Sequence, residues 1–145
     1  MKIEEIENLV RSGKTVEEVL SLVSWKEFEE KVEEIFKIHN FKTRRNFKFK
    51  TTKRFEIDII AEKRDLLFVI DCKQWNKGRY KMSALKKAAE KNLEKAKELQ
   101  STLIGRKRNK KIVPIIITLF DEAIYEHNGV FIVPLFKLNG FLLEF

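Results

Sequence analysis

Apolar positions in the N-terminal part of the chain recur at the spacing of an α-helix. Residues 25–39 carry an apolar stripe of period 3.6, and Ser24 ahead of them is a suitable N-cap residue. Two shorter stretches, residues 2–11 and 15–23, have a similar pattern on a smaller scale. The pattern therefore predicts two short helices followed by one well-defined amphipathic helix.

The spacing then changes to the alternation of period two that is typical of β-strands. Residues 47–50 alternate Phe with Lys, which predicts a half-exposed strand. Residues 55–62 and 66–73 are rich in apolar and β-branched side chains and predict two more strands. Because only a short connection separates these two, we expect them to form an antiparallel hairpin.

Helical and apolar segments alternate in the next part of the chain. Residues 83–102 have a helical apolar stripe, and the continuous apolar run of residues 112–119 predicts a central strand. With the elements before them, these segments predict an α/β fold with a mixed sheet. Residues 24–145 would form this domain, with residues 1–23 as an N-terminal helical extension.

The C-terminal segments allow more than one interpretation. Residues 121–127 are compatible with a short helix, which we favour, whereas Asn128-Gly129 could alternatively form a hairpin turn. Residues 130–133 predict another strand. Residues 135–145 are expected to cover the core, with one more strand possible over residues 141–145.

Composition narrows the class of protein. The 145 residues are 43% hydrophobic, enough for one core, and no apolar run is long enough to span a bilayer. The charged N-terminus has no signal-peptide pattern, so a cytoplasmic location is expected. The single cysteine, Cys72, excludes an internal disulfide and a cysteine-based zinc site, and we expect it to be buried.

The net charge of +8 is unevenly distributed. Residues 1–34 carry five basic and ten acidic side chains, so the other 111 residues account for a charge of +13. A polyanionic partner, DNA or alternatively RNA, would suit this basic body, although a solvated surface on a heat-adapted protein gives the same composition. The predicted nucleic-acid-binding residues are Arg44, Arg45, Lys48, Lys50, Lys53, Arg54, Lys77, Arg79 and Lys81.

The predicted hairpin contains a pair of aspartates. Strand alternation places Asp71 and Lys73 on one face of their strand. If the turn is centred on Arg64-Asp65, the residue numbers of each cross-strand pair add up to 129. Asp58 then lies across from Asp71. Two opposed carboxylates among apolar neighbours repel each other, unless a divalent cation such as Mg²⁺ lies between them.

These residue types suit metal-assisted phosphodiester hydrolysis. Asp58 and Asp71 would bind Mg²⁺, for which Mn²⁺ could substitute, and Lys73 would balance charge or hold the attacking water. Glu29 would add a third acid, since it projects about 40° from Trp25 along the edge of the apolar helix stripe. The alternative is a structural ion-pair network, in which Glu29 pairs with Lys73.

The motifs around these residues resemble the PD-(D/E)XK, or restriction-endonuclease-like, nuclease superfamily. The segments Glu56–Ala61 and Val69–Trp75 look like its two acidic motifs, with Ile57 where proline is common. The segment Trp25–Arg45 looks like the opening of Mrr-type endonucleases and archaeal Holliday-junction resolvases.

The resemblance implies a fold, an activity and a set of site residues. A three-layer core with a central mixed sheet flanked by helices would carry a Mg²⁺-dependent DNA endonuclease. Asp58 and Asp71 would be the metal ligands, with Lys73 and Glu29 catalytic. Gln74 would contact the phosphate or a base, or else be a solvent-facing strand end.

Two alternatives remain open from the sequence. A structure-specific Holliday-junction resolvase would be a nuclease of the same superfamily and would act as a homodimer. A catalytically silent nucleic-acid-binding module would keep the fold without cutting.

Overall fold

The computed structural model describes residues 5, 8–9, 11–15, 18, 24–74, 82–102, 110–122 and 124–145. Its helices, among these residues, are α3 (Trp25–Ile38), α4 (Met82–Ser101) and α6 (Leu135–Leu142). Its strands are β1 (Lys42–Lys50), β2 (Arg54–Lys63), β3 (Leu66–Lys73), β4 (Lys111–Thr118), β5 (Glu126–His127) and β6 (Val130–Pro134). The expected helix–strand order over residues 24–119 is therefore confirmed, but β1 begins at Lys42, five residues before the predicted strand at residues 47–50.

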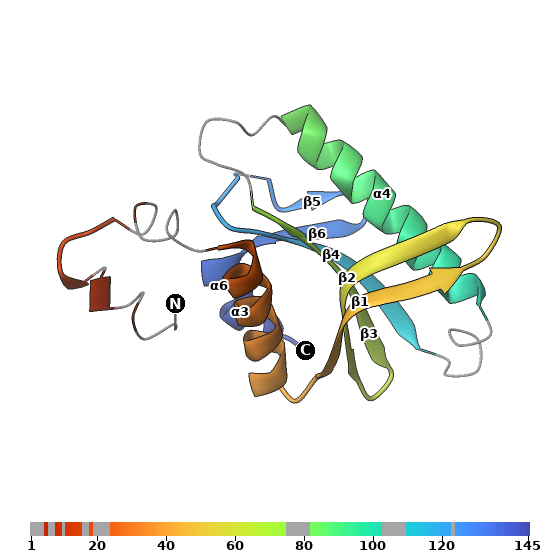
Figure 1. Cartoon of the computed structure of the whole chain (residues 1–145), viewed down its shortest axis with the longest axis horizontal. Coiled ribbons are helices and arrows are strands. Elements are labelled where there is room, and N and C mark those ends of the chain that lie inside the picture. The colour runs from red at the N-terminus through yellow and green to blue at the C-terminus, as the bar shows by residue number, and fades with distance from the viewer. Residues whose placement is uncertain are drawn as a thin grey trace.

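The strands form one mixed sheet in the order β1-β2-β3-β4-β6-β5. The first three strands are antiparallel neighbours, while β3 pairs in parallel with β4, and β4 with β6. Helices α3 and α6 lie against one face of the sheet and α4 crosses the other (Figure 1). The predicted three-layer α/β architecture is confirmed, and residues 112–119 belong to an inner strand as expected.

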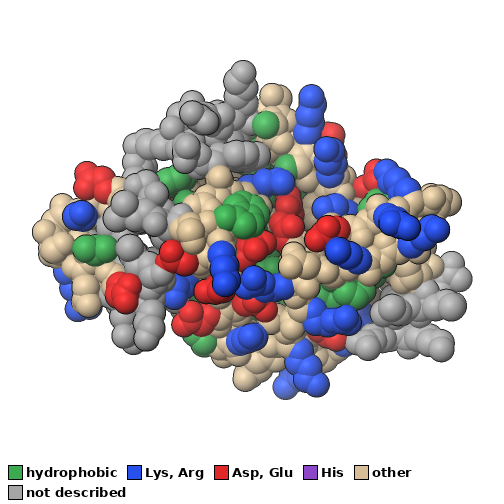
Figure 2. All heavy atoms as spheres, viewed as in Figure 1, with side chains coloured by type: hydrophobic (Ala, Val, Ile, Leu, Met, Phe, Trp, Pro, Cys, Tyr) green, Lys and Arg blue, Asp and Glu red, His purple; other side chains and the backbone are tan. Residues whose placement is uncertain are grey.

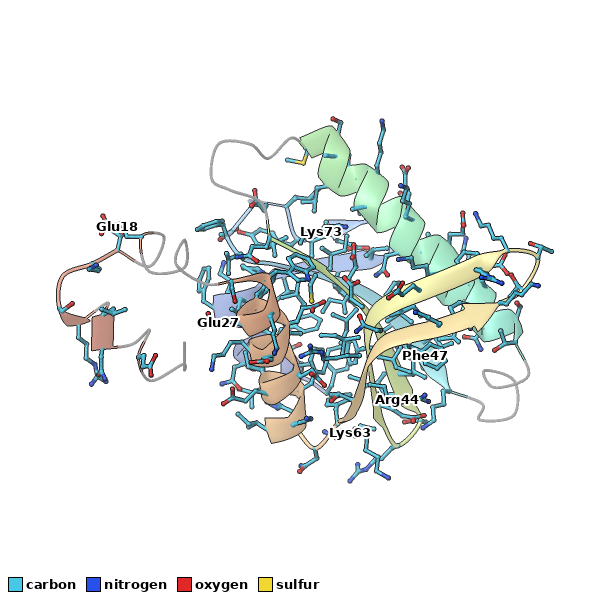
Figure 3. All side chains as sticks on the ribbon, in the orientation of Figure 1. Glu18, Glu27, Arg44, Phe47, Lys63 and Lys73 are labelled. Carbon is cyan, nitrogen blue, oxygen red and sulfur yellow. The ribbon has the colours of Figure 1, made fainter. Side chains whose placement is uncertain are left out.

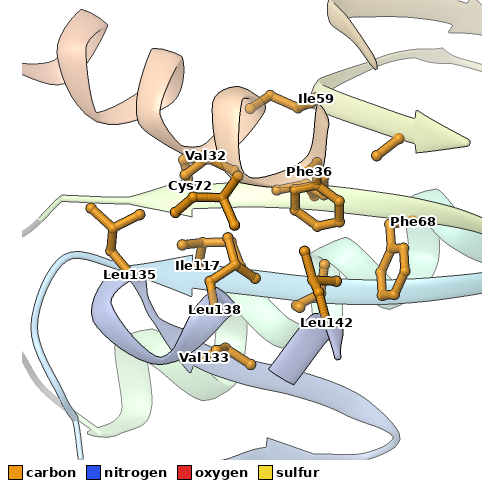
Figure 4. Packing of buried hydrophobic residues seen from close by; sticks show 14 of the residues in the cluster. Val32, Phe36, Ile59, Phe68, Cys72, Ile117, Val133, Leu135, Leu138 and Leu142 are labelled. Carbon is orange, nitrogen blue, oxygen red and sulfur yellow. The ribbon is translucent and has the colours of Figure 1, made fainter. Parts of the chain in front are cut away.

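The layer between the sheet and the helices α3 and α6 holds the largest hydrophobic cluster (Figure 4). Phe36 of α3 contacts Phe41 and Phe68 edge-on, with ring centroids 5.3 and 5.4 Å apart. Cys72 lies in the same cluster with none of its surface exposed, which confirms its predicted burial. This packing fixes α3, and with it Glu29, against the sheet.

The two faces of β3 alternate as the sequence predicts. Phe68, Ile70 and Cys72 pack toward α3, whereas Leu67 and Val69 belong to the cluster on the α4 side. By the same alternation, Asp71 and Lys73 lie on the α4 side of the sheet.

The prediction of a short helix over residues 121–127 is wrong. Glu126 and His127 form β5, which pairs with β6 through a two-residue turn at Asn128-Gly129. Both turn residues have positive φ, 51° and 85°, which is the conformation of a tight hairpin turn and which Asn and Gly adopt readily. The alternative of a hairpin turn at these residues is thereby confirmed.

The possible strand at residues 141–145 is also wrong. Leu135–Leu142 form α6, whose side chains Leu135, Leu138 and Leu142 are buried, and the chain then ends in a turn. These three positions have helical spacing, so the helix buries a continuous apolar stripe against the sheet. The expectation that residues 135–145 cover the core is confirmed.

The helices predicted over residues 2–11 and 15–23 lie largely outside the described residues. Within the part that is described, the Glu18 backbone N–H donates to Thr15 Oγ1 at 3.1 Å, which is the contact of an N-cap threonine. No helix among the described residues has the length and apolarity needed to cross a bilayer.

Candidate active site

Asp58 occupies the point where β2 and β3 separate. Their paired residues sum to 129, as predicted, from Lys63↔Leu66 up to Ile59↔Ile70. The regular pairing stops there, so Asp58 and Asp71 are not a ladder pair, contrary to the expectation. Instead, the Cys72 backbone N–H donates a hydrogen bond to Asp58 Oδ2 at 2.9 Å. The Asp58 carboxylate thus takes the place that a backbone carbonyl would have had.

The side-chain pattern of β2 inverts at the same residue. Ile59 packs in the cluster on the α3 side, whereas Ile57, two residues earlier, packs in the cluster on the α4 side. Successive side chains of a regular strand alternate, so residues two apart should share a face. Because Asp58 lies between the two orientations, its side chain can turn into the plane of the sheet toward β3.

Asp71 is the buried member of the pair, with 8% of its surface exposed. Burial raises the pKa of its carboxyl group to about 7; Lys73 opposes this shift, and Asp58 adds to it through its charge and a side-chain hydrogen bond. The two carboxyl groups therefore adjoin each other, although their strands no longer pair. A bound cation would relieve the same repulsion that favours the protonated form.

Lys73 is at the end of β3 (Figure 3). It lies beside Asp71, as strand alternation predicts. Its Nζ is 3.3 Å from Asp71 Oδ2, and about a third of the side chain (32%) is exposed. The ammonium group can therefore neutralise Asp71 and still reach an incoming anion. Gln74 is the next residue along the chain, half-buried and just beyond the strand.

Glu29 is brought close to Asp58 from α3. It is buried, with 9% of its surface exposed. Burial raises the pKa of its carboxyl group, and so does the nearby Asp58 charge; Arg45 and a hydrogen bond from the Trp25 side chain act in the opposite direction. Glu29 is thus near Asp58, and not the salt-bridge partner of Lys73, which pairs with Asp71.

The donor groups fit a hard divalent cation. Asp58 and Asp71 offer carboxylate oxygens, the ligands that Mg²⁺ prefers. Lys73 O accepts a hydrogen bond from Leu119 N on the β4 side, so the preceding carbonyl, of Cys72, points to the opposite side, toward Asp58. Over the described residues, no group of three or more His, Cys, Asp or Glu side chains is arranged to hold a metal ion. Water would therefore complete the coordination shell, as is usual for Mg²⁺.

Four of the predicted nucleic-acid-binding residues, Lys48, Lys50, Lys53 and Arg54, lie on an arm that extends beyond β3, whereas Arg44 and Arg45 precede it in β1. This arm is the part of the β1–β2 hairpin formed by residues 46–58, and it passes over α4 (Figure 1). Lys48, Lys50 and Arg54 are exposed on it. Figure 2 shows acidic side chains near the middle of this face of the molecule, with lysine and arginine side chains beside them and along the arm.

Three of the other predicted binding residues have partners within the protein. Arg45 Nη1 is 3.4 Å from Glu33 Oε1, and Lys53 Nζ is 2.8 Å from Glu94 Oε1. The guanidinium of Arg44 lies 5.1 Å from the centroid of the Phe47 ring, as a cation–π contact. Lys77, Arg79 and Lys81 lie outside the described residues.

Two residues near the site were not identified from the sequence. Asn46 of β1, which lies opposite Asp58 of β2, has φ of 53°. Asn92 of α4 is 1% exposed. The Asn92 side-chain amide donates to Val69 O and Ile115 O, both at 3.1 Å, and so ties α4 to β3 and β4 beside Asp71. A polar residue within the apolar stripe of residues 83–102 was the available signal for Asn92.

Comparison with known proteins identifies the relatives of this chain. The Mrr_cat family model, described as restriction endonuclease, matches residues 20–129. An uncharacterised protein of Archaeoglobus fulgidus is 36% identical over 119 residues, which are 81% of this chain and 88% of that protein.

Two solved structures align with this chain at lower identity. The small subunit of the heterodimeric restriction endonuclease R.BspD6I aligns with a TM-score of 0.52 and 13% identity, over 81% of this chain and 67% of that chain. A crystal structure of a protein of unknown function aligns with a TM-score of 0.48 and 21% identity. That alignment covers 79% of this chain and 54% of the other, so this chain spans about half the length of that protein.

Proposed function

The chain belongs to the restriction endonuclease family, and on that premise we propose that it is a metal-dependent DNA endonuclease that hydrolyses phosphodiester bonds. The observation that carries the proposal is the arrangement of three side chains at the end of β3: Asp58 Oδ2 accepts the Cys72 N–H at 2.9 Å, and Lys73 Nζ is 3.3 Å from Asp71 Oδ2. Two adjoining carboxyl groups repel each other when both are ionised, and the burial of Asp71 adds to this cost. They become favourable in a site that binds a cation.

Each residue of the site has a role in this proposal. Asp58 and Asp71 would hold Mg²⁺ or Mn²⁺, and the Cys72 carbonyl oxygen would be a further ligand. When bound, the cation would polarise the scissile phosphate and lower the pKa of an attacking water. Lys73 is exposed enough to stabilise negative charge on the phosphate and to orient that water. Glu29 is a third acidic group near Asp58, and it would contact the cation through a water molecule.

The choice of DNA as substrate rests on the family and on charge. The chain has a net charge of +8, and Lys48 and Lys50 are exposed on the arm, which begins at the pair Asn46 and Asp58. Contacts of lysine and arginine with phosphates give affinity without sequence selectivity. The arm would therefore hold the backbone of a nucleic acid while Asp58, Asp71 and Lys73 act on it.

A cleavage assay tests the proposed function. The protein is incubated with supercoiled plasmid, linear duplex, a four-way junction and single-stranded RNA, each with Mg²⁺, Mn²⁺ or EDTA. We expect metal-dependent cutting of at least one DNA, with a loss of at least about 100-fold in Asp71→Asn, since the variant removes a metal ligand. Asp65→Asn, which changes an exposed aspartate in the β2–β3 turn, is the matched control and should cut normally.

The outcomes separate the alternatives. Cutting restricted to the four-way junction would identify a structure-specific resolvase within the same proposal. Cutting of RNA alone would contradict the DNA assignment. DNA binding without cutting under any metal would overturn the endonuclease and favour a silent binding module.

A further inference from the structure

The conformation of Asn46 is unusual for its place in the structure. It lies within β1, with φ of 53°, in the left-handed region that non-glycine residues adopt rarely and mostly in turns. The flanking pairs are Arg45↔Ile59 and Phe47↔Ile57, and the two residue numbers in each pair add up to 104. Asn46 is therefore directly opposite Asp58, and these two residues form the one position at which the β1–β2 ladder is interrupted.

The side-chain orientation of β1 changes faces at Asn46, just as that of β2 changes faces at Asp58. Arg45 faces α3, where it pairs with Glu33, whereas Phe47 packs in the cluster that contains Ala96 of α4. The constant register means that neither strand contains an extra residue, so the inversion is not a bulge of one strand. Both strands turn over together, at a single pair of residues.

From this geometry we propose that Asn46 is a positioning residue for Asp58. Its left-handed backbone turns β1 over, the pairing on both sides carries β2 with it, and the Asp58 side chain is thereby directed into the sheet plane. There it accepts the Cys72 N–H and adjoins Asp71. The Asn46 side chain itself is exposed, so its effect on the site passes through the backbone and not through packing.

The proposal deepens the proposed function, because it concerns the same aspartate, yet the hydrogen bond can be measured without any metal or substrate. Cys72 is the single cysteine of the chain, so labelling with ¹⁵N-cysteine gives one amide signal in a ¹H–¹⁵N spectrum. Its proton shift reports the hydrogen bond to Asp58. Asp58→Ala defines the shift of the signal when that bond is absent.

Three variants test the backbone requirement. Asn46→Val disfavours the left-handed region, since β-branched residues adopt it least readily, and should move the Cys72 signal toward its position in Asp58→Ala. Asn46→Gly tolerates that region and should keep the wild-type signal. Asn128→Val places the same change at a residue with φ of 51° in the β5–β6 turn, and should leave the signal unchanged.

The metal affinity supplies the second measurement. Asn46→Val should weaken Mn²⁺ binding by about 10- to 100-fold, the range for groups that orient a ligand, and Asn46→Gly should restore it. If Asn46→Val does not fold, Asn46→Ala is measured in its place, with a smaller shift expected in the same direction.

An unchanged Cys72 signal in folded Asn46→Val, or in Asn46→Ala if that variant replaces it, would overturn the proposal. A shifted signal in a protein that binds no metal would leave Asn46 as the positioning residue and contradict the proposed function alone.

Discussion

At the scale of single residues, the site combines groups that oppose folding unless they bind a ligand. Asp71 is nearly buried beside Asp58; Lys73 and, more weakly, Lys95 offset the charge of Asp71, and the Cys72 N–H donates to Asp58. Burial raises the pKa of the Asp71 carboxyl group from 3.8 to about 7. Folding therefore favours its protonated form, whereas metal binding requires the ionised form.

This shift makes stability depend on pH. Between about pH 4 and pH 7 the folded state holds a proton that the unfolded state has lost, so the metal-free protein loses stability as the pH rises through this window. We expect Asp71→Asn to stabilise the metal-free protein by about 2–4 kcal/mol at pH 8, and far less at pH 4. Urea unfolding in EDTA at both pH values measures the difference.

The exposed Asp65 provides the control for this prediction. Asp65→Asn removes the same charge without removing a buried carboxyl group, so its effect should be small and similar at both pH values. A wild-type protein that becomes more stable from pH 5 to pH 8 in EDTA would contradict the account of Asp71.

At the scale of elements, local signals predicted most of the fold. The apolar stripe and the Ser24 cap predicted α3, and strand alternation placed Asp71 and Lys73 on one face of β3. Residues 121–127 were assigned wrongly, because β5 is two residues long and depends on pairing with β6, a tertiary contact that periodicity does not contain.

The site was predicted only in part, because it too depends on contacts between strands that periodicity does not contain. The register from the Arg64-Asp65 turn brought the two aspartates to one level of the sheet. The inversion at Asn46 and Asp58 could not be predicted, since Asn also adopts positive φ in ordinary turns, as Asn40 and Asn128 do here. Alternation alone therefore gave a regular ladder pair where the strands in fact separate.

The N-terminus of α3 matters because this helix carries Glu29. The Glu27 backbone N–H donates to Ser24 Oγ at 3.2 Å, and the Ser24 hydroxyl donates to Glu27 Oε1 at the same distance. Ser24→Ala should destabilise the protein by about 1 kcal/mol, whereas Ser24→Asp should retain most of the stability, because it still caps the helix. Thermal unfolding of both variants measures this.

Ser101, the last residue of α4, is the comparison for the cap. Its hydroxyl donates a hydrogen bond to Glu98 O on the surface, at the C-terminal end of that helix. Ser101→Ala should change stability by less than about 0.5 kcal/mol. Equal losses in Ser24→Ala and Ser101→Ala would show that the α3 cap has no special contribution.

At the scale of the whole molecule, charge separates into an acidic centre and basic surroundings. Asp58 of β2 lies next to Asp71 of β3 and near Glu29 of α3, and the arm, with Lys48 and Lys50 exposed, begins at Asp58. This arrangement suits a polyanion that is held by the periphery and cut at the centre.

The salt dependence of DNA binding tests this arrangement. The double variant Lys48→Ala/Lys50→Ala should weaken binding and reduce the slope of log K against log salt by about 2, if each lysine neutralises one phosphate. Lys91→Ala/Lys97→Ala removes the same charge from exposed positions on α4 and should change the slope little. Fluorescence anisotropy with Ca²⁺ in place of Mg²⁺ measures binding; equal effects of the two double variants would contradict a role for the arm.

The central claim is that Asp58 and Asp71 together bind one divalent cation, and calorimetric titration with Mn²⁺ tests it most directly. We predict one bound ion per chain in the wild type. Asp58→Asn and Asp71→Asn should each lower the affinity by at least about tenfold, while Asp65→Asn binds as the wild type does. A wild-type protein that binds no Mn²⁺ at pH 8, or one whose affinity survives both aspartate substitutions, would contradict the claim.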